Sequence, residues 1–214
     1  MQPRDVIQAV AAKTGDIGAS FYFQPLTLER GKALGLDGFR FYFLGRGGVL
    51  GDVEAGVVHS AFGYFNPQLL ARLWDTGKQV IAPRDCAREY IACAHARGGE
   101  WFGDVDGLDA YVDAAASVIA GADPAALALF AGVRAEPVPD DAPAAAIHQA
   151  MVLRELRGSA HLAAVAAVGL RTEIAHAIKR PNDVELFGWK GDDTPQPTDV
   201  DRAKLDRAEE ITDE

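Results

Sequence analysis

Segments with helical periodicity follow one another along almost the whole chain, and this pattern limits the possible fold more than any other feature. Apolar residues recur at intervals of three and four, and several segments begin with proline, which is favoured in the first helical turn. Strand-like alternation is scarce. The predicted helices cover residues 3–13, 25–34, 53–65, 67–75, 83–97, 106–120, 124–130, 144–157 and 159–178, and for the last of these we keep a break at Gly169 as an alternative. The sequence therefore predicts a mainly α, multi-helix globular protein.

One aromatic segment fits two periodicities. Phe39, Phe41 and Phe43 alternate as they would in a strand, whereas Phe39, Tyr42, Phe43 and Arg46 fit one face of a helix. The strand propensity of aromatic residues favours the first interpretation, and the surrounding helices favour the second. We predict a helix here and keep the strand as the alternative.

A glycine run follows this segment, from Gly45 to Gly51. A glycine loop between a strand and a helix can bind a dinucleotide pyrophosphate. The spacing G-x-G-x-x-G needs glycine at position 50, however, and that residue is Leu50. We interpret the run as a tight turn between two helices, in which Arg46 can hold a carboxylate or a phosphate.

The net charge of −10 and the isoelectric point near 4.9 argue against broad nucleic-acid binding, because neutralising phosphates needs an excess of Lys and Arg. No apolar run reaches the ~18 residues of a membrane span, and the N-terminus lacks the pattern of a signal peptide. The two cysteines suggest a reducing compartment. We therefore expect a cytoplasmic protein that binds neither nucleic acid nor membranes, and alanine-rich helices are compatible with a homo-oligomer.

The acidic charge is concentrated near the C-terminus. Residues 191–214 contain nine acidic and three basic residues, so they carry −6 and the preceding 190 residues carry −4. Two prolines follow a Gly-Asp-Asp run there, which indicates an exposed linker, and we expect the short polar helix after it to dock weakly or fray. The predicted organisation is a helical body at 1–190, aromatic and glycine-rich at 20–67 and alanine-rich at 83–180, followed by an acidic linker and helix at 191–214.

Aromatic residues gather in the first third of the chain, where ten of the eighteen lie between Phe21 and Phe65. Such a cluster forms either ordinary core or the wall of an apolar pocket with a few polar groups. Both interpretations hold if the pocket is a cavity within the core. The polar groups of this candidate pocket are Tyr22, Arg40, Tyr42, Arg46 and His59.

A basic segment in the last third is the second candidate. Arg154, Arg157 and His161 share a helix face if the helix continues through them. Facing inward they form an anion pocket, and facing outward they form a solvated basic strip. We expect Gly158 to break or tighten a helix junction and Ser159 to serve as the N-cap of the next helix.

The histidines and cysteines predict no metal site. None of the five histidines belongs to an H-E-x-x-H motif. Cys93 and His95 are two positions apart and point to different helix faces, so they and Cys86 do not make a ligand set. We expect both cysteines to be small buried hydrophobic residues.

Residues 153–161, Leu-Arg-Glu-Leu-Arg-Gly-Ser-Ala-His, resemble the Leu-Arg-Glu-His-Arg-Gly-x-x-His segment of a family of actinobacterial helix-turn-helix-related proteins. Residues 22–25 are similar to its Tyr-Phe-x-Pro, and residues 188–189 to its Gly-Trp. The resemblance implies a mostly helical protein that ends in a winged-helix-like module, with no established reaction. Leu156 replaces the usual histidine, and the segment after Trp189 is short and acidic. We therefore expect that module to be truncated and degenerate.

Three functions are compatible with these features. The first is a small-molecule-binding protein whose pocket is lined by the aromatic residues of the first third, with Arg46, Arg157 and His161 as polar contacts. Its ligand is partly apolar and carries an anionic or carbonyl group. The second is an enzyme acting on such a metabolite, with His161 or His59 as general base and Arg157 or Arg46 stabilising an oxyanion. The third is a transcriptional regulator with a degenerate DNA-binding module. The sequence identifies no cofactor.

Overall fold

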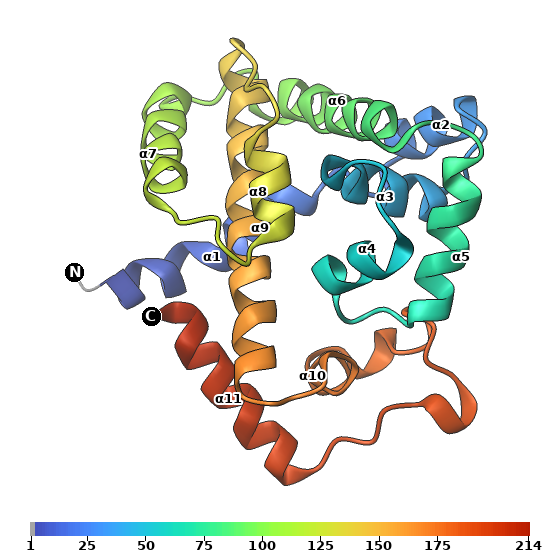
Figure 1. The fold of residues 1–214 in the computed structure, drawn as a ribbon. Helices are drawn as coiled ribbons and strands as arrows, with labels where there is room; N and C mark the ends of the chain where they lie inside the picture. Colours follow the sequence, from blue (N-terminus) through green and yellow to red (C-terminus); the bar gives the residue numbers. More distant parts are fainter. Residues whose placement is uncertain (1–2) are drawn as a thin grey trace.

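The computed structural model describes residues 3–214, which form eleven α-helices and no β-strand, so the predicted mainly α class is confirmed (Figure 1). None of these helices combines the length and the apolar character needed to cross a bilayer. The α-helices are α1 (Pro3–Ala19), α2 (Pro25–Ala33), α3 (Gly38–Gly47), α4 (Ala55–Phe62), α5 (Pro67–Lys78), α6 (Pro83–Phe102), α7 (Leu108–Gly121), α8 (Ala128–Arg134), α9 (Ala142–Ala167), α10 (Thr172–Lys179) and α11 (Asp199–Asp213). Short 3₁₀ turns occupy Gly48–Leu50, Pro181–Asp183 and Gly191–Asp193.

The longest helix, α9, runs through the middle of the molecule, and α1, α6, α7, α8 and α11 all pack against it (Figure 1). Asp141 caps its start by accepting a hydrogen bond from the Ala144 amide at 3.1 Å. At its end, Gly169 adopts φ +65°, and the Leu170 amide donates to the Val165 carbonyl at 3.1 Å. This is a Schellman end, in which glycine takes the left-handed conformation.

The predicted break at Gly158 is wrong, because α9 continues through it. Ser159, expected as an N-cap, is buried inside the helix. Glycine in a helix interior costs about 1 kcal/mol relative to alanine. Burial of the α9 residues on either side outweighs that cost, so tertiary packing overrides the local preference.

The ambiguous aromatic segment forms the helix α3, as predicted. Asp37 caps it by accepting from the Arg40 amide at 2.9 Å. Consecutive residues from Phe41 to Leu44 are all buried, which a helix surrounded by α2, α5 and α6 allows. The glycine run makes this burial possible: a Cβ at Gly45 would lie 2.5 Å from the Tyr90 side chain, and one at Gly48 would lie 2.0 Å from the Pro83 carbonyl. The run therefore lets α3 and the turn after it approach α6 closely.

Two separate apolar cores hold the molecule together. The large core joins the aromatic first third to α6, α8 and α9, and includes Phe21, Phe43, Trp74, Tyr90 and Phe130. The small core lies between the end of α9, α10 and α11, at the lower end of α9 in Figure 1, and includes Val165, Leu170, Ile174, Leu205 and Ala208. The C-terminal helix, which we expected to dock weakly, is thus attached through a core of its own.

Candidate functional site

A group of buried polar side chains, here called the central polar cluster, lies inside the large core. Its members come from four parts of the chain that the sequence separates widely. They are Tyr22 after α1, Tyr42 and Arg46 on α3, Tyr90 on α6, and Arg154 and Glu155 on α9.

Glu155 is the hub of this cluster and is only 3% exposed. Arg46 donates to both of its carboxylate oxygens, from Nε to Oε1 at 2.9 Å and from Nη2 to Oε2 at 2.8 Å. Arg154 Nη1 donates to Oε1 at 2.8 Å, and the Tyr22 hydroxyl approaches the same oxygen at 3.4 Å. Burial alone raises the pKa of the Glu155 carboxyl, but the two arginines outweigh it and lower that pKa to about 2. Glu155 is therefore ionised at neutral pH.

Aromatic rings surround the two guanidinium groups. Arg46 donates from Nη1 to the Tyr42 hydroxyl at 3.0 Å, and its guanidinium carbon lies 4.4 Å from the centre of the Phe62 ring. The Arg154 guanidinium lies 5.0 Å from the centre of the Tyr22 ring. These cation–π contacts partly replace the hydration that the arginines lose on burial.

Two arginines and one carboxylate leave the central polar cluster with a net charge of +1. Tyr90 is 2% exposed, and its hydroxyl has no hydrogen-bond partner among residues 3–214. Buried polar groups in folded proteins are nearly always hydrogen-bonded, so this hydroxyl is an unused donor. Tyr90 also lines a cavity of about 20 Å³, whose walls are Tyr22, Gly45, Arg46, Val49, Tyr90, Ile91, Leu129, Val133, Met151 and Glu155.

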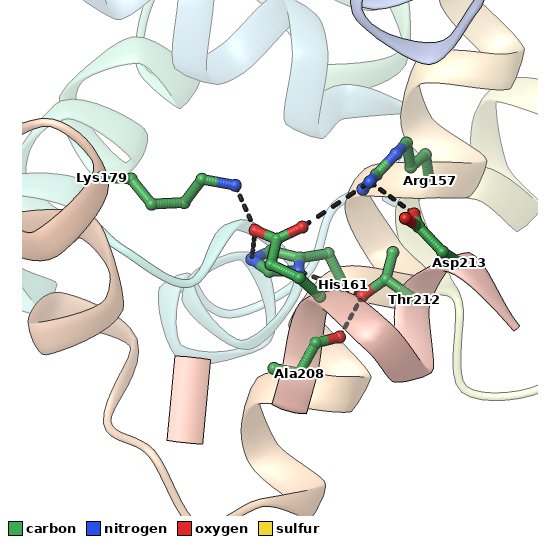
Figure 2. Close-up of polar contacts among 7 residues, drawn as sticks. Arg157, His161, Lys179, Ala208, Thr212 and Asp213 are labelled. Atoms are coloured by element: carbon green, nitrogen blue, oxygen red, sulfur yellow. Dashed lines mark hydrogen bonds and ion pairs between the residues drawn. The ribbon is translucent and has the colours of Figure 1, made fainter. Parts of the chain in front are cut away.

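A second polar group, here called the α11 clasp, joins α9 and α10 to the C-terminal helix (Figure 2). It consists of Arg157 and His161 on α9, Lys179 on α10, and Glu209, Thr212 and Asp213 on α11. Arg157 Nη2 lies 2.8 Å from Asp213 Oδ1 and 3.6 Å from Glu209 Oε2. The Lys179 ammonium donates to Glu209 Oε1. Glu209 thus contacts cations on both α9 and α10.

His161 lies between these groups with its two ring nitrogens in different environments (Figure 2). Thr212 Oγ1 donates to the Ala208 carbonyl at 2.7 Å, so it accepts at 3.1 Å from His161 Nδ1. His161 Nε2 lies 3.7 Å from Glu209 Oε1. Burial lowers the pKa of the His161 ring, although Glu209 acts in the opposite direction.

The structure divides the candidates that the sequence placed together. Tyr22, Tyr42, Arg46 and Arg154 meet in the central polar cluster. The other four lie elsewhere: Arg157 and His161 face α11, His59 Nε2 lies 3.0 Å from the Phe65 carbonyl oxygen, and Arg40 pairs with Asp37 at 2.7 Å at the start of α3.

Sequence reasoning missed Glu155 and Tyr90. Glu155 follows Arg154 directly and lies one helical turn after the apolar Met151 and Val152, which indicates a carboxylate on a buried face. Tyr90 lies on the predicted apolar face of its helix with Cys86 and Cys93, and nothing in the sequence indicates an unpaired hydroxyl there.

A larger cavity of about 370 Å³ lies between the start of α2 and the second half of α6. Its volume falls in the range usual for small-molecule sites. Its wall includes no residue that the sequence singled out as a ligand-binding candidate. It is lined by Phe21, Gln24, Pro25, Leu26, Thr27, Glu29, Cys93, Arg97 and Glu100.

The described part of the chain contains no group of three or more His, Cys, Asp or Glu residues placed to hold a metal ion. Cys86 and Cys93 are both buried, and burial raises the pKa of the Cys86 thiol to about 12. His95 and His148 form a pair between α6 and α9, with His95 Nε2 3.1 Å from His148 Nδ1. Burial lowers the pKa of the His148 ring to about 4, so it is neutral at pH 7.

Comparison with known proteins gives one match. The model of a helix-turn-helix family matches residues 7–193, which is most of the chain. No protein of curated function and no solved structure matches it.

Proposed function

The chain belongs to a helix-turn-helix family, and within that family we propose that it binds a small ligand with an anionic or carbonyl group at the central polar cluster. The observation that carries this proposal is the Tyr90 hydroxyl, a buried donor without a partner among residues 3–214, on a residue that lines a cavity beside a net positive charge. A carboxylate or carbonyl oxygen accepts from a hydroxyl and is attracted by a guanidinium.

The size of the cavity limits the ligand. About 20 Å³ is room for roughly one water molecule, so any larger ligand must displace a wall of the cavity. The α8 helix supplies Leu129 and Val133 to that wall. Leu129, Phe130 and Val133 of this seven-residue helix are buried in the large core, so a large displacement of α8 would be costly. We therefore propose a ligand of a few heavy atoms, with its apolar part toward α8.

Tyr90→Phe tests this proposal, because it removes the unused donor without removing any hydrogen bond of the protein. Thermal unfolding is measured with formate, acetate, pyruvate and acetone as probes. A probe at 100 times its Kd stabilises the native state by about 2.7 kcal/mol. We expect a rise in Tm for the wild type with at least one probe, and no rise for Tyr90→Phe.

The matched control is Tyr111→Phe on α7, which removes a hydroxyl away from the cluster and should keep the rise in Tm. Equal stabilisation of Tyr90→Phe and the wild type would contradict the proposal. So would the absence of stabilisation by every probe.

A second candidate function is transcriptional regulation, with which membership of a helix-turn-helix family is compatible. Residues 63–66 join α4 and α5 in a short turn that begins with Gly63 at φ +62°. Two helices joined by a turn of three or four residues with glycine are typical of DNA-binding helix-turn-helix units. Asn66 caps α5 by accepting from the Gln68 amide at 3.0 Å. Arg72 is exposed on α5, where a recognition helix would present its side chains.

This second candidate is tested by fluorescence anisotropy with a labelled random-sequence DNA duplex at low salt. We expect salt-sensitive binding that weakens several-fold in Arg72→Gln. Arg88→Gln, which removes an exposed arginine from α6, is the matched control. Binding that is insensitive to Arg72→Gln would exclude α5 as the contact.

A further inference from the structure

The α11 clasp contains a set of cations whose acidic partners all come from one helix. Among the ion pairs of the described residues, Arg157, His161 and Lys179 contact only Glu209 and Asp213. If α11 moved away, α9 and α10 would present two permanent cations and a histidine with no carboxylate beside them. These three residues are here called the basic strip.

The apolar attachment of α11 is separate from the large core, although α11 packs against α9 and touches α1. Its apolar contacts belong to the small core, which shares no residue with the large core. The chain before it, residues 194–198, contains two prolines and lies outside any helix. The helix is closed at its start by its own capping box, in which Thr198 and Asp201 exchange hydrogen bonds. Release of α11 would therefore leave the large core and the central polar cluster in place.

The segment that carries the basic strip is positive in spite of the acidic chain. Residues 151–190 contain six basic and four acidic residues, a net of +2. The acidic residues of the body are concentrated at 101–150, with eight acidic residues and one basic, a net of −7. That segment includes α7, which lies beside the other end of α9 (Figure 1). The strip is thus distant from the strongest negative charge of the body.

The basic strip is a surface and not a pocket. The side chains of Arg157 and Lys179 remain 35% and 50% exposed with α11 in place, and neither lines one of the two cavities described above. An enclosed site suits a small anion, whereas an open row of cations on two helices suits an extended polyanion.

We propose that α11 is an autoinhibitory cover that occupies a phosphate-binding surface on α9 and α10, and that the partner replacing it is the backbone of duplex DNA. The carboxylates of Glu209 and Asp213 stand where phosphate groups would lie. This inference rests on the second candidate function, because it supplies the regulation of DNA binding by a member of a helix-turn-helix family.

The test uses the full chain with Glu209→Gln and Asp213→Asn, which weakens the cover without removing α11. Affinity for a labelled DNA duplex is measured by fluorescence anisotropy across a salt series. We expect the affinity to rise at least about fivefold. The slope of log K against log[salt] should steepen by about 2, one unit for each of Arg157 and Lys179.

Two further variants separate the proposal from a general charge effect. Asp192→Asn with Asp206→Asn makes the same change in net charge at exposed positions outside the clasp, and should leave the affinity close to that of the wild type. The Glu209→Gln, Asp213→Asn variant is here called the uncovered variant. Adding Arg157→Gln and Lys179→Gln to it should abolish the gain in DNA affinity. Circular dichroism confirms the fold of each variant, and hydrogen exchange in α11 shows whether the cover has loosened.

A gain in the Asp192 and Asp206 control equal to that of the uncovered variant would overturn the proposal. A gain that survives Arg157→Gln and Lys179→Gln would also overturn it. If the wild type binds DNA through Arg72 and the uncovered variant binds no more tightly, the second candidate function is retained. The proposal that α11 is an autoinhibitory cover is then rejected. Binding of pyrophosphate by the uncovered variant without binding of DNA would replace the partner by a small phosphate.

Discussion

The central polar cluster and the α11 clasp lie one turn apart on α9, and they differ in where their carboxylates come from. In the cluster, Glu155 belongs to α9 itself and is almost fully buried. In the clasp, Glu209 and Asp213 come from a separate helix; Asp213 is buried, but the Arg157 and Glu209 side chains stay 35% and 30% exposed. An ion pair in the core cannot lose one partner without stranding a charge, whereas a pair at the surface can exchange its partner for water. The central polar cluster therefore fixes the packing of the helices that contribute to it, and the α11 clasp is suited to reversible contact.

The largest expected effect is on the central polar cluster. Glu155→Gln keeps the shape of the hub but leaves Arg46 and Arg154 without a counter-charge in the core. Breaking a buried ion pair in this way costs about 3–5 kcal/mol. Urea unfolding followed by circular dichroism should show a loss of this size in the free energy of unfolding.

The matched variant for the clasp is Glu209→Gln, which makes the same chemical change at a carboxylate whose side chain is 30% exposed. Ion pairs near the surface contribute about 0–1 kcal/mol, so we expect a loss below about 1 kcal/mol. If the two variants lost equal stability, burial would not be what separates the two clusters.

The next effect concerns mild acid, between pH 6.5 and 4, which should act on a buried pair outside the central polar cluster. The Glu155 carboxyl, with a pKa of about 2, stays ionised down to low pH. His148 has a pKa of about 4 in the folded state and about 6.5 when unfolded. Between these values the unfolded chain binds more protons, so stability falls as the pH is lowered from 6.5 to 4. At about 1.4 kcal/mol per pH unit, the loss in the free energy of unfolding reaches about 3 kcal/mol at pH 4.

The measurement is the free energy of unfolding at several pH values for the wild type and His148→Asn. Asparagine retains a polar group near the position of Nδ1, which faces His95, but it does not titrate. We expect a shallower pH dependence in the variant. An unchanged slope between pH 6.5 and 4 would assign the acid sensitivity to other groups.

The smallest expected effect is that of salt on the α11 clasp. Screening by 1 M NaCl weakens exposed ion pairs and affects buried ones much less. Amide hydrogen exchange in α11 should therefore accelerate by up to about fivefold, corresponding to about 1 kcal/mol, while exchange in α3 stays unchanged. Equal acceleration in both helices would show that salt acts on the whole fold and not on the clasp.

Features with local causes could be predicted from the sequence. Asp37 before an aromatic segment caps α3, and Gly169 ends α9 in a left-handed turn. The helical character of residues 38–47 follows from the neighbouring helices. Gly158 shows where local reasoning failed: its preference against a helix is worth about 1 kcal/mol, and packing on the central helix exceeds that.

The candidate site could be predicted only in part. Tyr22, Tyr42 and Arg46 were recognisable as polar groups among aromatic residues, and Arg154 as part of a basic helix face. The structure brings these four together. Their common partner Glu155 is 109 positions from Arg46 in the chain, so no local pattern connects the two. The partners of Arg157 and His161 lie on a helix that the sequence presents only as an acidic tail.

The sequence by itself determined that this protein is helical, because the spacing of apolar residues and the capping residues act within a few positions of each other. It also indicated that Arg154, Arg157 and His161 would lie toward one side of a helix if that helix continued through Gly158, as α9 does. Only the tertiary structure decided what faces each of them. Arg154 lies roughly 60° around the helix from Arg157, so one face is wide enough for two neighbours. The ion pair of Arg46 on α3 with Glu155 beside one part of that face, and the packing of α11 against the other part, turned one predicted anion pocket into two different sites.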